Sequence, residues 1–350
     1  MRSLGASADV VGLLDSSRRL STHSVYGHYW DRWLRWADAQ SVDPLRPTDI
    51  QLANFLADLF VRDNLALSSV KGYRSAINST IAQLGGGVRN ASNNPHLLRD
   101  LIRGASLRDA RVPRRAPAWD LVQVLASLRE APYEPLGQAS LKFLSFKTAF
   151  LLTLASGRRG SEVHALSGSA ADIAFERDGG VSLHFLPEFL AKNQVPGSVS
   201  PTLVIPALTR ILGPDDADRL LCPVRALRFY LSRTQPLRSH THRRLFISYD
   251  VSHARDISLQ TLSRWLREVI KQAYLSSAIP ITPRVHEIRA WSASLAFKHS
   301  VPLHAILEAA YWRSEATFVH YYLRDVRRLR QDGSFGVASA VVAQSTLTSS

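Results

Sequence analysis

The residues best suited to chemistry are phosphate-binding and nucleophilic side chains spread over the second half of the chain. Two arginines lie in Ser156–Glu162, His286 and Arg289 are three residues apart, and the adjacent tyrosines Tyr321 and Tyr322 come later. An arginine can bind a phosphate through two parallel hydrogen bonds and keeps its charge. A phenol can act as a nucleophile and divide one difficult displacement into two easier ones. Such a set is suited to attack on a phosphodiester without a metal ion.

The arginine segment, with the sequence SGRRGSE, follows the apolar run Phe150–Ala155. An apolar helix that ends at Gly157 would place Arg159 at the start of the next helix, where Glu162 could orient its guanidinium. Taken alone, the pattern is more typical of a structural salt bridge, and Arg158 could take the same part.

The later motifs are also weak when taken singly. His286 and Arg289 would point to one side of a helix and could bind a phosphate there. The same spacing is common on solvated helix faces. Trp312 and the tyrosine pair would, by themselves, be ordinary packing residues.

Composition independently favours a polyanionic partner. The chain has 350 residues, 45% of them hydrophobic, and a formal net charge of +14. The length predicts two domains, and the apolar content is sufficient for real cores. Only six of the 43 basic residues are lysines, so arginine carries most of the charge. This balance favours nucleic acid over a role in solubility alone.

Several other classes of site have no signal in the sequence. The one cysteine, Cys222, excludes a disulfide framework and a cysteine-based zinc site, and its apolar neighbours predict a small buried residue at the start of a helix. No HExxH or similar histidine pair occurs, so we expect neither a metal nor another cofactor. The N-terminus lacks an apolar signal segment and no run is long enough to span a membrane, which predicts an intracellular protein.

The chain is predicted to contain two folded domains between less regular segments. A flexible N-terminus, 1–18, precedes a helical domain, 19–107. Residues 108–117 (RDARVPRRAP) form a basic linker stiffened by proline. A second domain, 118–331, is followed by a tail, 332–350. The predicted fold class is mainly α with a small antiparallel β-sheet.

The first domain shows helical periodicity. Helices are expected from Thr22, over 48–59, over 70–84 with Ser68 and Ser69 as caps, and over 95–107. The glycine run 85–87 should end the third helix. The basic residues expected to contact DNA phosphates in this domain and the linker are Lys71, Arg74, Arg111, Arg114 and Arg115.

The second domain mixes helices with a short β region. Residues 179–206 alternate around a Gly/Pro/Ser turn, which predicts a β-hairpin or a three-stranded sheet. Helices are expected over 121–129, 141–154, 223–233, 258–274, 284–299, 303–310 and 315–330.

In the order R…K…HxxR…W…Y, the motifs together resemble the tyrosine recombinase (phage integrase) family over Thr22–Arg330. SGRRGSE is similar to the family's arginine motif T/S-G-x-R-x-S-E, which selects Arg159 rather than Arg158. Lys192 matches the lysine of the family's β-hairpin. Trp312 stands where most members have histidine and some have tryptophan. Gly160 departs from the pattern, since a larger apolar residue is usual there.

The finer resemblance is to recombinases of eukaryotic DIRS-like retrotransposons, in which the nucleophile follows the pattern W-x-S-x-x-T-F-x-x-x-Y-L-R-D. That pattern selects Tyr322, ten residues after Trp312. Many bacterial members place the nucleophile nine residues on, which would be Tyr321. The resemblance also implies a nuclear location if the host is eukaryotic.

The resemblance implies a helical core-binding domain and an α+β catalytic domain that together clamp double-stranded DNA, with four protomers on two duplexes. It implies strand exchange through a 3′-phosphotyrosine intermediate, without metal or ATP. The implied catalytic residues are Arg159, Lys192, His286, Arg289, Trp312 and Tyr322. The alternatives are a type IB topoisomerase, and a DNA-binding protein descended from a recombinase that no longer cuts.

Overall fold

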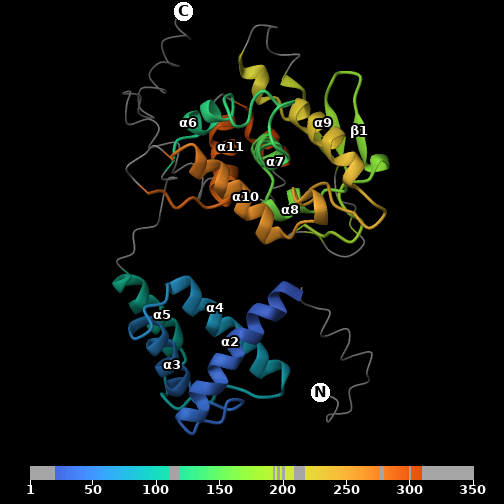
Figure 1. Cartoon of the computed structure of the whole chain (residues 1–350). Coiled ribbons are helices and arrows are strands. Elements are labelled where there is room, and N and C mark those ends of the chain that lie inside the picture. Colours follow the sequence, from blue (N-terminus) through green and yellow to red (C-terminus); the bar gives the residue numbers. More distant parts are fainter. Residues whose placement is uncertain are drawn as a thin grey trace, which may run out of the picture. The chain divides into compact units, whose positions relative to one another are not determined.

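The computed structural model describes residues 20–109, 119–191, 194, 198, 202–208, 217–275, 280–298 and 301–309. In these residues most regular structure is helical, with one three-stranded antiparallel sheet (Figure 1). This confirms the predicted fold class. The chain divides into two compact units, Met1–Pro113 and Arg114–Ser350, called the N-terminal and C-terminal units below. The finer domain limits stay predictions, and α5 continues to Arg108, one residue into the predicted linker.

The N-terminal unit contains four described helices around one apolar core. They are α2 (Leu20–Ala39), α3 (Asp49–Val61), α4 (Leu67–Gln83) and α5 (Leu97–Arg108). Trp33 is fully buried and meets the ring of Phe55 edge-on, with 5.1 Å between ring centroids. Tyr29 on α2 stacks on Tyr73 of α4 at 4.0 Å. Helical spacing thus brings the aromatic residues of α2 into the core, although Val25, at the same spacing, is exposed.

Two helix ends of this unit agree with the limits predicted from the sequence, and one helix start differs. Thr48 begins α3 with a reciprocal capping box, as its side chain accepts from the Gln51 amide and the Gln51 side chain accepts from the Thr48 amide. The glycine run ends α4 as predicted, with Gly85 at φ +75°. The predicted caps Ser68 and Ser69 are wrong. The helix begins at Leu67 after Ala66, which makes no side-chain capping bond.

In the C-terminal unit, one apolar helix lies at the centre. The helices are α6 (Leu121–Ser127), α7 (Leu141–Ser156), α8 (Gly160–His164), α9 (Pro223–Thr234), α10 (Leu259–Gln272), α11 (His286–Lys298) and α12 (Leu303–Ala309). Short 3-10 turns lie at Ala170–Asp172, Ala217–Leu221, Gln235–Leu237 and Val251–His253. Most of α7 is buried, and α8, α9, α10 and α11 pack against it (Figure 1). A helix that is apolar nearly all round requires such a central place.

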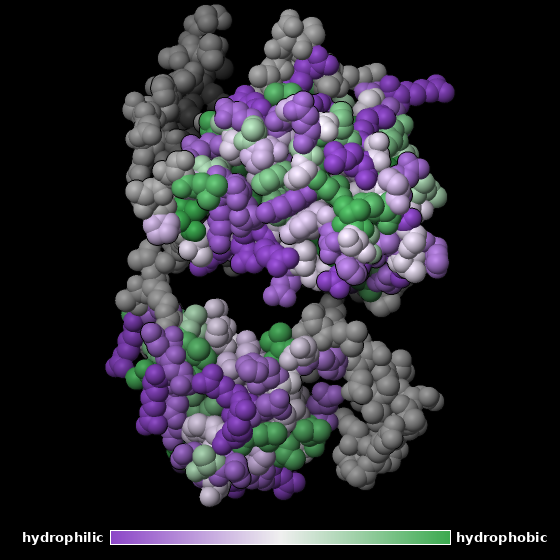
Figure 2. All heavy atoms as spheres, viewed as in Figure 1, coloured by the Kyte–Doolittle hydropathy of each residue, from purple (hydrophilic) through white to green (hydrophobic). Residues whose placement is uncertain are grey.

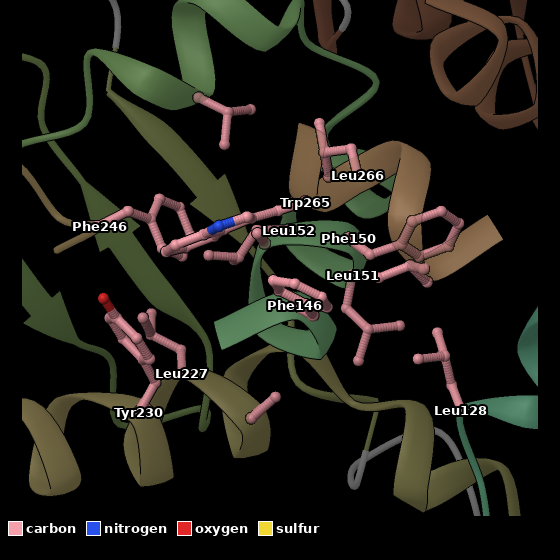
Figure 3. Close-up of a cluster of buried hydrophobic side chains, with 14 of the residues drawn as sticks. Leu128, Phe146, Phe150, Leu151, Leu152, Leu227, Tyr230, Phe246, Trp265 and Leu266 are labelled. Atoms are coloured by element: carbon pink, nitrogen blue, oxygen red, sulfur yellow. The ribbon is translucent and has the colours of Figure 1, made fainter. Parts of the chain in front are cut away.

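The core around α7 joins aromatic side chains from α7, α9 and α10 and from the segment that carries Phe246 (Figure 3). Phe146 of α7 lies 5.7 Å from Trp265 of α10, between ring centroids. Tyr230 of α9 is fully buried, and its hydroxyl accepts a hydrogen bond of 2.9 Å from the Ile247 amide. Burial raises the pKa of Tyr230 to about 12, so the phenol stays protonated at neutral pH. Cys222 is buried just before α9, as its apolar neighbours predicted.

The small sheet has three strands of three residues each. They are β1 (Ile173–Phe175), β2 (Val181–Leu183) and β3 (Leu203–Ile205), antiparallel in the order β1-β2-β3. The three-stranded alternative for the β region is therefore right. Its first strand lies before the predicted segment, because three residues are too few for alternation to be recognised in the sequence.

A buried cluster of charges connects α7 to its surroundings. The ammonium group of Lys147, fully buried on α7, donates to the Glu134 carboxylate and to the Leu128 carbonyl. Arg225 of α9 donates two further bonds to Glu134, of 2.7 and 3.1 Å. Burial raises the pKa of Glu134, but the hydrogen bonds from Arg225 and Lys147 outweigh it and leave that pKa below its ordinary value of 4.5.

Replacing Glu134 with alanine should therefore destabilise the fold strongly, because the buried ammonium of Lys147 loses its counter-charge. We expect the free energy of unfolding to fall by about 3–5 kcal/mol.

The same carboxylate should make stability depend on pH. A carboxyl group whose folded pKa is lowered contributes stability above its unfolded pKa and loses it as the pH falls through the folded pKa. The wild type should thus lose stability below pH 4.5 more steeply than Glu134→Gln. Denaturant titrations at neutral and acid pH measure both effects. The exposed Glu130 gives the control variant Glu130→Ala, and equal losses in the two alanine variants would contradict the prediction.

Candidate active site

The arginine segment forms a sharp break between two helices. Ser156 ends α7, and Gly157 adopts the left-handed conformation at φ 58° and ψ 13°. A side chain at Gly157 would be strained there, which explains glycine at this place. Arg159 then precedes α8 as its N-cap residue, and its carbonyl accepts bonds from the amides of Glu162 and Val163. The predicted break at glycine with an arginine at the next helix start is confirmed.

Glu162 holds the two arginines of this segment differently. Its carboxylate is 1% exposed and lies 2.8 Å from a terminal nitrogen of Arg159 and 3.8 Å from one of Arg158. The side chain of Arg159 is 29% exposed, whereas that of Arg158 is 6% exposed. Arg159 is thus the more accessible of these two guanidinium groups, with its position fixed from within by a charge-assisted bond.

The start of α8 lies against the start of α11. A Cβ atom placed on Gly160 would meet Val285, the residue before His286, at 3.4 Å from its Cγ1. A Cβ atom at Gly160 would thus make an ordinary van der Waals contact with the residue that precedes α11. The fold therefore brings the Arg159 segment beside the segment that carries His286 and Arg289.

His286 and Arg289 both lie in the first turn of α11, as predicted, but they differ in exposure. His286 is exposed, while Arg289 is 4% exposed. Ile288 between them is fully buried and joins the main core. Core packing thus fixes the backbone of this turn, which is a requirement for a positioned phosphate site.

Two further residues near the site escaped the sequence analysis. Glu287, 6% exposed, accepts hydrogen bonds of 2.9 Å from the Trp119 indole and from the Arg284 amide. His164 on α8 lies 2.8 Å from the Ile257 carbonyl and 3.3 Å from an Arg244 nitrogen. Burial lowers the pKa of His164, which keeps the ring neutral and able to donate to that carbonyl. A single acidic residue in a first helical turn was the only sequence signal for Glu287.

The remaining predicted residues fall into two groups. Lys71 is exposed and Arg74 partly exposed, one turn apart on α4 of the N-terminal unit. Hydrophilic side chains cover much of the visible face of each unit (Figure 2). The predicted residues that lie outside the described residues are Arg111, Arg114, Arg115, Lys192, Trp312, Tyr321 and Tyr322.

The described residues contain no group of three or more His, Cys, Asp or Glu side chains placed to hold a metal ion. None of their helices combines the length and apolar character needed to cross a bilayer.

Comparison of the sequence with protein-family models and with curated proteins gives no match. The structure is similar to the Tn1549 transposon integrase in complex with transposon right end DNA, with a TM-score of 0.55, 13% identity, and 87% of this chain and 86% of that chain covered. It is similar to the XerH site-specific recombinase bound to palindromic difH substrate, with a TM-score of 0.53, 16% identity and coverage of 81% and 71%. It is also similar to a lambda integrase dimer bound to a COC′ core site, with a TM-score of 0.52 and 17% identity. That match covers 90% of this chain and 99% of the lambda integrase chain. The chain therefore has the tyrosine recombinase fold.

Proposed function

We propose that this protein is a site-specific DNA recombinase that cuts and rejoins DNA through a 3′-phosphotyrosine intermediate. The observation that carries the proposal is the placement of Arg159 by the buried Glu162, at a helix start that lies against the α11 turn of His286 and Arg289. This arrangement occurs on the fold of enzymes whose structures contain their DNA substrates. The net charge of +14 suits the same partner.

In the proposed reaction the two arginines bind the non-bridging oxygens of one phosphodiester. They stabilise the negative charge that increases as phosphorus becomes five-coordinate. The phenol of Tyr322 attacks phosphorus and loses its proton, with assistance from His286. The bond to the 5′-oxygen breaks, and Lys192 protonates that leaving group. Trp312 donates its indole N–H to the phosphate.

The intermediate keeps the energy of the broken bond in a tyrosine–phosphate ester. Attack by a different 5′-hydroxyl reverses the step and joins new DNA partners, so no nucleotide is consumed.

We propose that four protomers carry this out on two duplexes. The residues proposed to contact DNA phosphates are Lys71, Arg74, Arg111, Arg114 and Arg115. An origin in a mobile element is supported by the likeness to a transposon integrase. Its DIRS-like character and a nuclear location stay predictions from sequence resemblance.

Covalent trapping tests the proposal directly. A binding site is first selected from random duplexes, and the protein is then incubated with that duplex carrying a nick near the scissile position, in excess EDTA. The nick lets the short 5′ fragment diffuse away, so the covalent complex should accumulate and survive a denaturing gel. The positive charge that the reaction needs comes from the chain itself, so EDTA should have no effect. An adduct that requires Mg²⁺, or bound DNA that is never cut, would contradict the proposal, and the second outcome would indicate a protein that only binds.

A further inference from the structure

The point where the chain enters the C-terminal unit is bonded to the start of α11. Trp119 is the first described residue after the gap 110–118, and it is 3% exposed. Its indole nitrogen donates to the Glu287 carboxylate at 2.9 Å, between residues 168 positions apart in the sequence. The Trp119 ring also packs beside Trp291 of α11, with 6.0 Å between ring centroids.

The same carboxylate oxygen fixes the turn before α11. The Arg284 amide donates to it at 2.9 Å, two residues before His286. A buried carboxylate needs donors of this kind, because losing one leaves part of its charge unsatisfied. Glu287 lies between His286 and Ile288, so its position sets the direction in which the first turn of α11 leaves the core.

The rest of the segment Trp119–Gln123, called the junction segment below, is bonded to the end of α10. The Asp120 amide donates to the Tyr274 hydroxyl at 2.6 Å. The Gln123 side-chain amide donates to the Ala273 carbonyl at 2.8 Å. The junction segment therefore holds the end of α10 and the beginning of α11 in a fixed relation.

From these contacts we infer that Trp119 and Glu287 are positioning residues, which orient His286 and Arg289 through the hydrogen bond that joins the junction segment to α11. The inference rests on the proposed function. Neither residue touches the DNA in this account, and both act through the backbone of the first helical turn. A small misorientation of groups that bind a transition state slows the chemical step without weakening DNA binding in proportion.

The chain provides a closely matched pair of variants. Trp119→Phe removes an indole N–H that is bonded to Glu287, while keeping most of the ring. Trp291→Phe removes, from the neighbouring ring, an indole nitrogen that has no hydrogen-bond partner within the described residues. We expect the rate of adduct formation at saturating DNA to fall about 10-fold in Trp119→Phe, since a hydrogen bond to a charged group contributes that order of free energy. Trp291→Phe should stay within about twofold of the wild type.

Substitutions at Glu287 complete the test. Glu287→Gln keeps an oxygen that can accept both bonds and should retain most of the rate, whereas Glu287→Ala should lose at least as much as Trp119→Phe. Adding Trp119→Phe to Glu287→Ala should cause no further loss, because the indole acts through the carboxylate. The Kd for DNA and the melting temperature are measured for each variant. Both should change little in Glu287→Gln. In Trp119→Phe the Kd should change little, while the melting temperature should fall modestly because the buried carboxylate loses one donor.

The outcomes separate this inference from the proposed function. Equal rates in Trp119→Phe and Trp291→Phe, with a normal wild-type adduct, would overturn the inference alone. The inference would also be overturned if the rate in Trp119→Phe fell only in proportion to its DNA affinity and melting temperature, since general destabilisation has that effect. No adduct from the wild type would overturn the proposed function and this inference together.

Discussion

Replacing Arg159 with alanine is expected to reduce adduct formation at saturating DNA by about 100- to 1000-fold, the usual cost of removing one preorganised donor to a developing charge. The side chain is fixed by Glu162 at 2.8 Å yet remains 29% exposed, so it can meet a phosphate without first being ordered. Most DNA affinity should remain, because many other arginines contribute phosphate contacts. The melting temperature should also fall, because the buried Glu162 loses its partner at 2.8 Å, so trapping is carried out well below the unfolding temperature of the variant. Single-turnover trapping and a binding titration measure the two effects separately.

Arg158→Ala is the matched control, one residue earlier in the same motif. The Arg158 side chain is 6% exposed beside the buried Glu162, so its loss should lower the melting temperature without a comparable loss of adduct formation. Arg159→Lys should recover only part of the rate, because an ammonium group cannot bind the phosphate through two parallel bonds. If Arg158→Ala abolished the adduct at an unchanged melting temperature while Arg159→Ala cut normally, the assignment within the motif would be wrong by one residue.

Local signals explain why much of the fold was predictable. Thr48 satisfies amide groups at the start of α3 and Gly157 permits the left-handed end of α7, so both helix limits are determined by neighbours in sequence. The apolar run Phe150–Ala155 indicated a helix that ends at Gly157, whereas its central place in the core became evident only from the structure. The order of the site motifs indicated the fold family even though sequence identity to solved relatives is 13–17%.

Features that depend on distant partners were not predictable. The different burial of Arg158 and Arg159 arises from how α8 packs, and each alone fits the same sequence pattern. The bond between Trp119 and Glu287 joins residues 168 positions apart, so neither residue indicates the other in a single sequence. The start of α4 was mispredicted for a related reason. Ser68 and Ser69 could have capped a helix, but α4 begins after Ala66 without a side-chain cap, since tertiary packing can override such local preferences.

The largest effect is expected from Tyr322→Phe, which should eliminate the adduct completely. The substitution removes only the hydroxyl oxygen that would form the bond to phosphorus, so binding of the DNA should be unchanged. Neighbouring residues on a helix point about 100° apart at roughly 3.6 residues per turn, so only one of two adjacent tyrosines can face the phosphate. Both tyrosines lie outside the described residues, and the assignment rests on the sequence pattern after Trp312. Trapping with nicked DNA in EDTA, alongside a binding titration, measures the outcome.

Tyr321→Phe is the natural control, since it makes the same chemical change one residue earlier. It should retain an adduct, with at most a modest loss of rate or stability from altered packing. Digesting the trapped complex and identifying the peptide that carries the nucleotide would assign the attachment residue independently of any substitution. An adduct that persists in Tyr322→Phe and disappears in Tyr321→Phe would transfer the nucleophile to Tyr321, the spacing of many bacterial relatives. An adduct that persists in both single variants would mean that either phenol can reach phosphorus, which a rigid helix does not allow.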